Sequence, residues 1–255
     1  RKNAEITIEV NPRSSIQEKL SAYRDSGINR LSIGIQSQNE DELKTLERIH
    51  TAEESTETVR AARKAGFDNI SIDFIYGTPG QTLNSWDVTL KSVTQMKPEH
   101  VSAYTLMLEA GTRMTNQVEN GELMLPDDDI MSDMFEIAYK YLDSLGYHLY
   151  ELSNYARSGF ESRHNIHYWK RKPYLGFGMS SHAFDGTTRA WNTTNFSKYF
   201  ESLDKGELPV DGTEILSKNQ IMNEVIMLGL RMNNGLSLSE FGKQFGKRSA
   251  ESLAG

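Results

Sequence analysis

The segment from Glu161 to Phe184 concentrates side chains that could bind a metal ion or a flat ligand. Three of the chain's six histidines fall within it, and aromatic rings are interleaved with them. These residues are His164, His167, His182, Tyr168, Trp169, Tyr174 and Phe177. Imidazole nitrogens ligate metals, including haem iron, and aromatic faces stack on flat rings. A metal site, a large flat ligand and plain packing are therefore three explanations for this segment.

The spacing of two of these histidines helps to distinguish a metal site from a flat ligand or plain packing. His164 and His167 are three residues apart, so on a helix they share one face. No neighbouring acid or cysteine completes a zinc ligand set around them. The aromatic neighbours favour a flat, polarisable ligand, and a porphyrin ligated by a histidine fits that pattern. The alternative is structural: the aromatic rings pack, and His164 is hydrogen-bonded to the backbone.

A second set of polar residues recurs at the ends of predicted strands. Glu9, Gln36 and Asp73 lie near the C-terminal ends of three strands, and Arg48 follows the helix after the second. Carboxylates accept hydrogen bonds from hydroxyl or ammonium groups, and an arginine fork can hold a carboxylate. The C-terminal strand ends of a parallel sheet face its ligand site. We therefore predict one shared binding cleft, against the alternative that each residue is an ordinary polar strand end.

The order of elements predicts the parallel sheet that would bring these residues together. Four runs rich in β-branched and apolar residues alternate with amphipathic segments: 5–10, 30–37, 69–77 and 100–108. One amphipathic segment, 55–66, predicts a helix with Ser55 as its N-cap. This βαβα order indicates an α/β fold, either a doubly wound sheet or part of a (β/α) barrel.

The pattern changes after the fourth strand. An amphipathic helix is predicted to open with three aspartates at 127–129, and a single strand is predicted over 147–156. Two helices joined at 233–235 are predicted near the C-terminal end, as the beginning of a small helical domain.

Composition excludes several classes of protein. The net charge of −7 argues against a sequence-independent nucleic-acid binder. No apolar run reaches the roughly 20 residues of a membrane-spanning helix, and we predict a cytoplasmic protein. The 255 residues include no cysteine, which excludes thiol nucleophiles and thiolate-held clusters from this polypeptide.

Several motifs together resemble one family. They are "IEVNPR", "RLSIGIQS", "LERIH", "SIDFIYGTPGQT", "VSAYTLMLEAGT" and "YELSNYARSGFESRHNIHYW". In order and spacing they resemble the radical S-adenosylmethionine (radical SAM) proteins of the oxygen-independent coproporphyrinogen III oxidase group. The HNxxYW element, formed by His164, Asn165, Tyr168 and Trp169, is similar to that of the haem-chaperone (HemW) branch.

The resemblance implies a function and a set of site residues. It implies a haem chaperone that binds haem and passes it to acceptor proteins; the alternative is the oxidase itself, which decarboxylates coproporphyrinogen III. It assigns Glu9, Gln36, Arg48 and Asp73 to S-adenosylmethionine. The HNxxYW residues are assigned to haem, with His164 as the first candidate for the iron and His167 the second. No catalytic residue is predicted.

The resemblance also implies a fold and one major departure from the family. The implied fold is a three-quarter (β/α)6 barrel lacking its first two strands, over 1–150. A C-terminal extension over 151–212 and the start of a helical domain over 213–255 follow it. The family's CxxxCxxC loop, which holds three irons of a [4Fe–4S] cluster, is absent. We therefore expect a fragment without radical activity, which self-associates through its exposed first strand.

Overall fold

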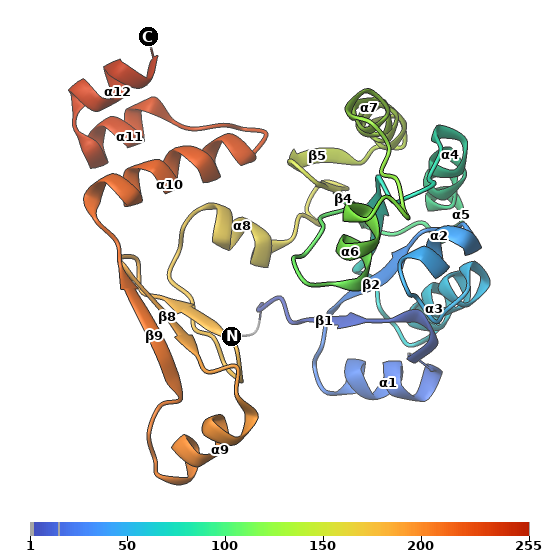
Figure 1. Ribbon diagram of the computed structural model, residues 1–255, viewed down its shortest axis with the longest axis horizontal. Helices are drawn as coiled ribbons and strands as arrows, with labels where there is room; N and C mark the ends of the chain where they lie inside the picture. The colour runs from blue at the N-terminus through green and yellow to red at the C-terminus, as the bar shows by residue number, and fades with distance from the viewer. Residues whose placement is uncertain (1–2, 15, 255) are drawn as a thin grey trace. The chain divides into compact units, whose positions relative to one another are not determined.

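The computed structural model describes residues 3–14 and 16–254. The predicted segments 1–150 and 213–255 include positions 1, 2, 15 and 255, which lie outside the described residues. The chain divides into two compact units, Arg1–Ser162 and Arg163–Gly255 (Figure 1). Among the described residues, no helix is long and apolar enough to cross a membrane.

The first unit alternates strands and helices. In chain order its elements are β1 (Thr7–Val10), η1 (Pro12–Ser14), α1 (Gln17–Asp25), β2 (Arg30–Gln36), α2 (Glu40–Thr45), α3 (Ala52–Lys64), β3 (Ile70–Tyr76), α4 (Leu83–Lys91), α5 (Val93–Met96), β4 (His100–Thr105), α6 (Arg113–Glu119), α7 (Asp128–Ser144), β5 (His148–Glu151) and β6 (Asn154–Ala156). The described strands form a six-stranded sheet in the order β1-β2-β3-β4-β6-β5. The first four pair in parallel, which confirms the predicted α/β fold with helices outside a parallel sheet.

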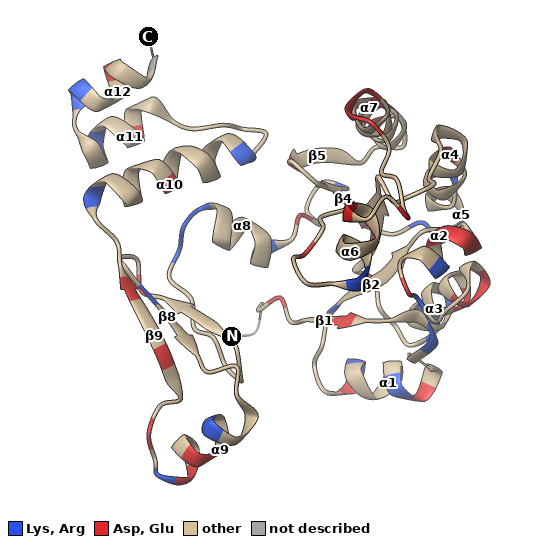
Figure 2. Ribbon diagram, in the orientation of Figure 1, with Lys and Arg blue, Asp and Glu red and all other residues tan. Residues whose placement is uncertain are grey.

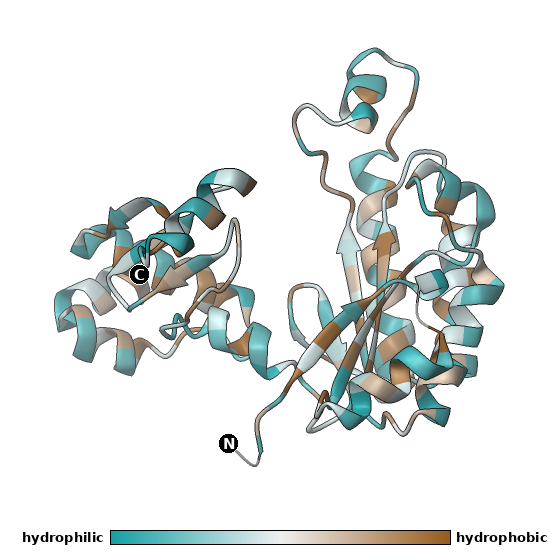
Figure 3. Cartoon of the chain, turned by 90° about the horizontal axis from the view of Figure 1, so that it is seen from below, coloured by the Kyte–Doolittle hydropathy of each residue, from teal (hydrophilic) through white to brown (hydrophobic). Residues whose placement is uncertain are grey.

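The two faces of this sheet differ in chemistry because successive side chains of a strand point to opposite sides. One face carries buried apolar residues that pack against the helices, such as Ile33, Ile72 and Val101. Trp86 of α4 is fully buried in this core, and its indole Nε1 donates a hydrogen bond to the Met134 carbonyl of α7 at 2.8 Å. Figure 3 accordingly colours much of the larger sheet brown and the covering helices mostly teal. The opposite face is polar.

Two sequence predictions for this unit are wrong in detail. Helix α3 begins three residues before Ser55; its N-cap is Thr51, which forms a capping box with Glu54. Ser55 is instead buried and donates its hydroxyl to the Thr51 carbonyl. The single strand predicted over 147–156 is a hairpin, in which β6 pairs antiparallel with both β4 and β5. Its turn at Leu152–Ser153 contains neither glycine nor proline, the two strongest turn signals in a sequence.

The second unit combines a small sheet with helices. Its elements are α8 (Arg163–Trp169), β7 (His182–Phe184), β8 (Thr188–Asn192), α9 (Phe196–Asp204), β9 (Val210–Ile215), α10 (Lys218–Arg231), α11 (Leu238–Phe245) and α12 (Lys247–Ala254). Strands β7, β8 and β9 form an antiparallel sheet. Helices α10 and α11 confirm the predicted helix pair joined at 233–235. The division into segments 1–150, 151–212 and 213–255 stays a prediction.

Candidate functional site

The polar face of the larger sheet carries residues from four adjacent parallel strands. Glu9 of β1 lies beside Ser32 of β2 in the strand register, and Asp73 of β3 lies beside Ser102 of β4. The Ser32 hydroxyl donates to Asp73 Oδ2 at 2.8 Å, which links the two pairs. The β1–β2 register and this hydrogen bond thus place Glu9 and Asp73, predicted from separate strand ends, on either side of one serine.

Asp73 is held by hydroxyl groups rather than by a direct ion pair. Ser71 donates to its Oδ1 at 3.2 Å, and Ser32 and Ser102 also bond to the carboxylate. Burial raises the pKa of Asp73, an effect opposed by the three serines and by the charge of Arg30. A carboxylate in this setting has unused acceptor capacity and gains from a further donor, such as a hydroxyl or ammonium group of a ligand.

A chain of hydrogen bonds leads from Asp73 to the β5–β6 hairpin. Ser71 Oγ lies 2.8 Å from His100 Nδ1, and His100 Nε2 lies 2.8 Å from the Tyr150 hydroxyl. Burial lowers the pKa of His100 well below its usual range and raises that of Tyr150, so both are neutral at pH 7. The single hydroxyl hydrogen of Ser71 is donated to Asp73, so Ser71 can only accept from His100. The imidazole proton is therefore assigned to Nδ1, and Nε2 accepts from the Tyr150 hydroxyl. The Ser162 amide then donates to Tyr150 at 3.3 Å.

Gln36 and Arg48, the other two predicted residues, lie near Asn11 at the C-terminal ends of β1 and β2. Arg48 Nη1 donates to Asn11 Oδ1 at 3.2 Å. Gln36 is buried and adopts a left-handed backbone conformation with φ of 70°. A Cβ atom on Gly34 would lie 2.7 Å from Gln36 Nε2 and 3.5 Å from Asn11 Oδ1, so the glycine leaves room for these two amides. Burial lowers the pKa of Arg48.

A pocket of about 420 Å³ adjoins this group and is lined by Asn11, Arg48 and the loop up to His50. Glu9, Gln36 and Asp73 are not among its lining residues. The structure therefore forms two clusters: Glu9 with Ser32 and Asp73, and Gln36 with Asn11 and Arg48. That the four predicted residues hold one ligand remains a prediction.

Helix α8 in the second unit carries the HNxxYW element, and none of its seven residues is buried. The exposed His164 ring packs edge-on against Tyr168, with ring centres 4.7 Å apart. Tyr168 in turn packs against Tyr174 at 4.6 Å, and Tyr174 forms a backbone bridge to Phe184 of β7. Tyr168 thus anchors the helix to the small sheet and supports the His164 ring.

The remaining residues of the element differ in their surroundings. His167 Nε2 lies 2.8 Å from the Pro173 carbonyl, which occupies that ring nitrogen. Trp169 lies under the guanidinium of Arg231 at 4.2 Å. Asn165 and His164 each take part in a further interaction. The helix therefore carries two exposed histidines, His164 with aromatic support and His167 bonded to a carbonyl, and a half-buried tryptophan at its C-terminal end.

Sequence reasoning missed most of the residues that surround Asp73. Arg30, Ser32, Ser71, His100 and Ser102 all lie on the polar face, and all five are largely buried. Their signal was present as polar residues at every second position of β2, β3 and β4. Glu151 and Asn154 of the hairpin are also buried, and the Asn154 amide donates to the Glu151 carboxylate.

Metal and cluster ligands can be tested against the side chains present. Across positions 3–14 and 16–254, no group of three or more His, Cys, Asp or Glu side chains could hold a metal ion. The sequence has no cysteine, so its residues do not fit a [4Fe–4S] cluster held by thiolates. A haem iron can be held by one histidine, and His164 is exposed.

Comparison with known proteins gives consistent matches. Residues 1–93 match the radical SAM superfamily, and residues 216–255 match the HemN C-terminal domain. The chain is 34% identical to heme chaperone HemW of Bacillus subtilis over 96% of its length, and 35% identical to HemW of Mycobacterium tuberculosis over 99%. It spans 64% and 65% of the length of these relatives.

A solved structure extends the match to the fold. Coproporphyrinogen III oxidase (HemN) from Escherichia coli, a radical SAM enzyme, superposes on the whole chain with a TM-score of 0.84 and 25% identity. The chain covers 61% of that protein. The radical SAM and HemN C-terminal matches, the HemW relatives and this structure support a HemW-like radical SAM protein.

Proposed function

We propose that this chain is the haem-binding part of a haem chaperone, which transfers haem to acceptor proteins. The observation that carries the proposal is the exposed imidazole of His164, supported edge-on by Tyr168 on a helix with no buried residue. An accessible histidine beside aromatic rings can ligate haem iron and cover part of the porphyrin. The printed names of the relatives, heme chaperone HemW, agree with this use.

The proposal assigns a different ligand to the first unit. Glu9, Gln36, Arg48 and Asp73 are proposed to bind S-adenosylmethionine. Asp73 and Glu9 offer acceptors for hydroxyl and ammonium groups, and Arg48 offers a donor for a carboxylate. The cluster of the family would supply an electron to that cofactor, but no residue of this chain can hold it. We therefore assign no radical chemistry to this chain.

Haem titration and transfer test the proposal. Haemin added to the chain should give a shifted Soret band with saturable stoichiometry. Mixing the loaded chain with apo-myoglobin should then move the spectrum to that of myoglobin. A chain that gives only the spectrum of free haemin, at protein concentrations well above that of haemin, would overturn the proposal.

The oxidase is the second candidate function. The fold match to coproporphyrinogen III oxidase (HemN) favours it, but the identity of 25% is below the 34–35% to the HemW relatives. Production of protoporphyrinogen IX by the full-length protein would support the oxidase, and haem transfer without that product would support the chaperone.

Two further parts of the proposal concern location and assembly. A cytoplasmic site of action follows from the sequence prediction and is tested by cell fractionation. Strand β1 lies at one edge of the sheet among the described strands, and an edge strand can pair with a second copy. Light scattering should therefore show dimers at high concentration, whereas a monodisperse monomer would contradict self-association.

A further inference from the structure

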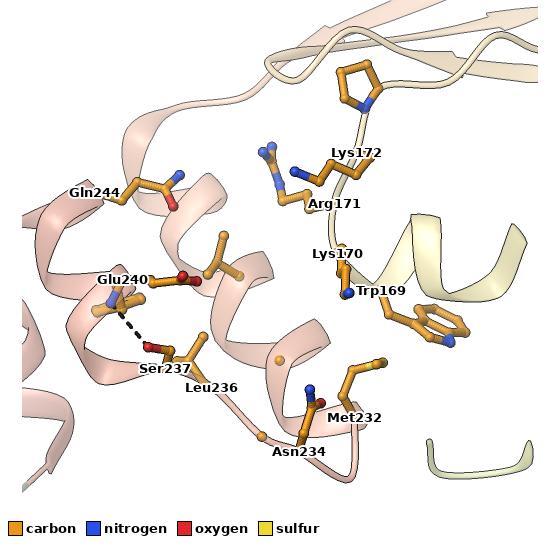
Figure 4. A pocket seen from close by; sticks show the side chains of 15 residues that line it. Trp169, Lys170, Arg171, Lys172, Met232, Asn234, Leu236, Ser237, Glu240 and Gln244 are labelled. Atoms are coloured by element: carbon orange, nitrogen blue, oxygen red, sulfur yellow. Dashed lines mark hydrogen bonds between the residues drawn. The ribbon is translucent and has the colours of Figure 1, made fainter. Parts of the chain in front are cut away.

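The second unit contains a pocket of about 720 Å³ next to the HNxxYW helix (Figure 4). The end of α8 and the following loop, 169–173, form one wall; α10, α11 and the turn between them form the other. Volumes of about 300–1,000 Å³ are typical of small-molecule sites. The pocket is therefore large enough for a ligand of the size of a cofactor.

Three consecutive cations lie on the first wall, and they form the blue stretch after α8 in Figure 2. Arg171, the middle one, is fixed: its Nε donates to Glu224 at 2.8 Å and its Nη1 to the Gly186 carbonyl at 2.9 Å. Lys170 and Lys172 on either side are exposed, and within the described parts of the chain neither pairs with a carboxylate. Figure 4 shows Arg171 and Lys172 extending from the loop, opposite Glu240 and Gln244.

The backbone holds these lysines in a defined position. Helix α8 ends with the Arg171 amide bonded to the Tyr168 carbonyl and the Lys172 amide bonded to the His167 carbonyl. This pair of bonds is the Schellman arrangement, in which the left-handed residue is usually glycine. Here Arg171 takes that conformation, with φ of 51°, and its side-chain bonds hold it there. The loop is thus anchored while the two lysine side chains remain free.

The same pocket offers a flat surface and unused donors. Trp169 lines it, and its indole Nε1 finds no acceptor among the residues that the structure describes. Arg171 Nη2 likewise has none there, although the Arg171 side chain is only 11% exposed. Buried donors are nearly always paired, but both nitrogens are shielded from solvent here, so acceptor oxygens of a ligand would reach them only if the two side chains shifted toward the pocket. The apolar side chains of Met232 and Leu236 line the opposite wall.

We infer that Lys170 and Lys172 bind the propionate carboxylates of haem at this pocket, next to Trp169; His164, the proposed iron ligand, is on the same helix but does not line the pocket. The inference rests on the proposed function, because it takes haem as the ligand of this chain. It adds the carboxylate subsite, which distinguishes a dicarboxylate porphyrin from an uncharged one. Glu240 is the acid that lines the pocket, and it lies on the wall opposite the lysines.

Paired titrations with haemin and with its dimethyl ester test the inference. Lys170→Met combined with Lys172→Met should weaken haemin binding about tenfold, or about threefold for each exposed charge pair lost. The same variant should bind the dimethyl ester as the wild type does, since the ester has no carboxylates. A control variant, Lys198→Met with Lys205→Met, removes two exposed lysines from the α9 region of the same unit and should change neither affinity.

The outcomes separate this inference from the proposed function. Wild-type chain that binds neither porphyrin overturns both. Wild-type chain that binds haemin, with an unchanged affinity in the Lys170/Lys172 variant, overturns the carboxylate subsite alone. Equal weakening of haemin and ester also overturns it, because the loss would then be structural. Lys170→Arg with Lys172→Arg keeps both charges and should retain haemin binding.

Discussion

The two candidate sites are built in opposite ways. On the sheet face of the first unit, Asp73, Ser71, His100 and Tyr150 are joined by successive hydrogen bonds, and neighbouring strands fix each one. On helix α8 of the second unit, His164 and Trp169 are partly or fully exposed, and Lys170 and Lys172 beside them are solvated. The first arrangement fixes its polar groups between neighbouring strands, whereas the second carries its groups on a helix with no buried residue.

This difference suits the two proposed ligands. A cofactor that must be held for chemistry needs a preorganised site, because small displacements of reacting atoms are costly. A cargo that must leave again needs accessible groups and modest affinity. The exception within the second unit is the ion cluster of Arg171, Arg189 and Glu224, which anchors the loop behind the lysines. If the two sites differ in this way, substitutions in the ion cluster and the buried sheet face should cost more stability than substitutions on α8.

The largest effect is expected at Glu224, which accepts from Arg171 at 2.8 Å and from Arg189 at 2.6 Å. Glu224→Gln leaves two cations close together and should destabilise the second unit by about 3 kcal/mol at pH 7, as for a broken buried pair. This loss of stability is measured by urea unfolding in which hydrogen exchange is followed separately for peptides from residues 163–254. Glu207→Gln is the control, since Glu207 is exposed and forms no ion pair with any described residue.

The pH dependence of this effect has a defined sign. Burial alone would raise the pKa of Glu224, but the two arginines outweigh it and lower the pKa. The ion pair therefore stabilises the fold above the ordinary glutamate pKa of about 4.3, and that stability is lost as the pH falls through the lower folded value. The difference between Glu224→Gln and wild type should shrink below about pH 4. A difference that stays constant down to pH 3 would contradict the assignment.

The next effect tests whether the sheet face acts as one network. Tyr150→Phe removes the hydroxyl that bonds to His100 and Ser162, and should cost about 1–2 kcal/mol. Ser71→Ala removes the other partner of His100. In a double-mutant cycle the two should couple by at least about 0.5 kcal/mol. As a control, the stability losses from Tyr150→Phe and from Ser144→Ala, at an exposed serine of α7, should simply add. If the losses from Tyr150→Phe and Ser71→Ala also simply add, the residues do not act as one network.

A smaller effect of opposite sign is expected at Asp73. Because burial raises the pKa of Asp73, its ionisation opposes folding as the pH rises above about 4. Asp73→Asn should therefore raise Tm at pH 7 by about 2–4 °C, the shift that about 1 kcal/mol produces in a unit of this size. The gain should vanish near pH 3, and exposed Asp68→Asn should show none. A lower Tm at pH 7 would show that Asp73 stabilises the fold.

The smallest effect is expected at His167. Its bond to the Pro173 carbonyl is exposed, so His167→Ala should cost about 0.5 kcal/mol in urea unfolding. A loss of unfolding free energy above about 2 kcal/mol would contradict the view that α8 is an exposed, weakly held helix.

The sequence was sufficient for the parallel sheet but not for the contacts between its strands. The apolar runs of β2 and β3 and the alternation of strands and helices predict the sheet directly. Ser71 and His100 meet only because the register of β3 and β4 places them side by side, 29 residues apart. Similarly, Arg171 and Glu224 are 53 residues apart, and no local pattern predicts their pairing. The hairpin at 151–154 was missed because its turn relies on Glu151 and Asn154 rather than on glycine or proline.

The central claim is that haem binds through His164 of the second unit and not through the sheet face of the first. Haemin titration of wild type, His164→Ala, His167→Ala and Asp73→Asn, read at the Soret band, tests it most directly. We predict an affinity at least about tenfold weaker for His164→Ala, as for a lost metal ligand, with the other two variants matching wild type. A His164→Ala chain that binds haemin as tightly as wild type, with the same spectrum, would contradict the account.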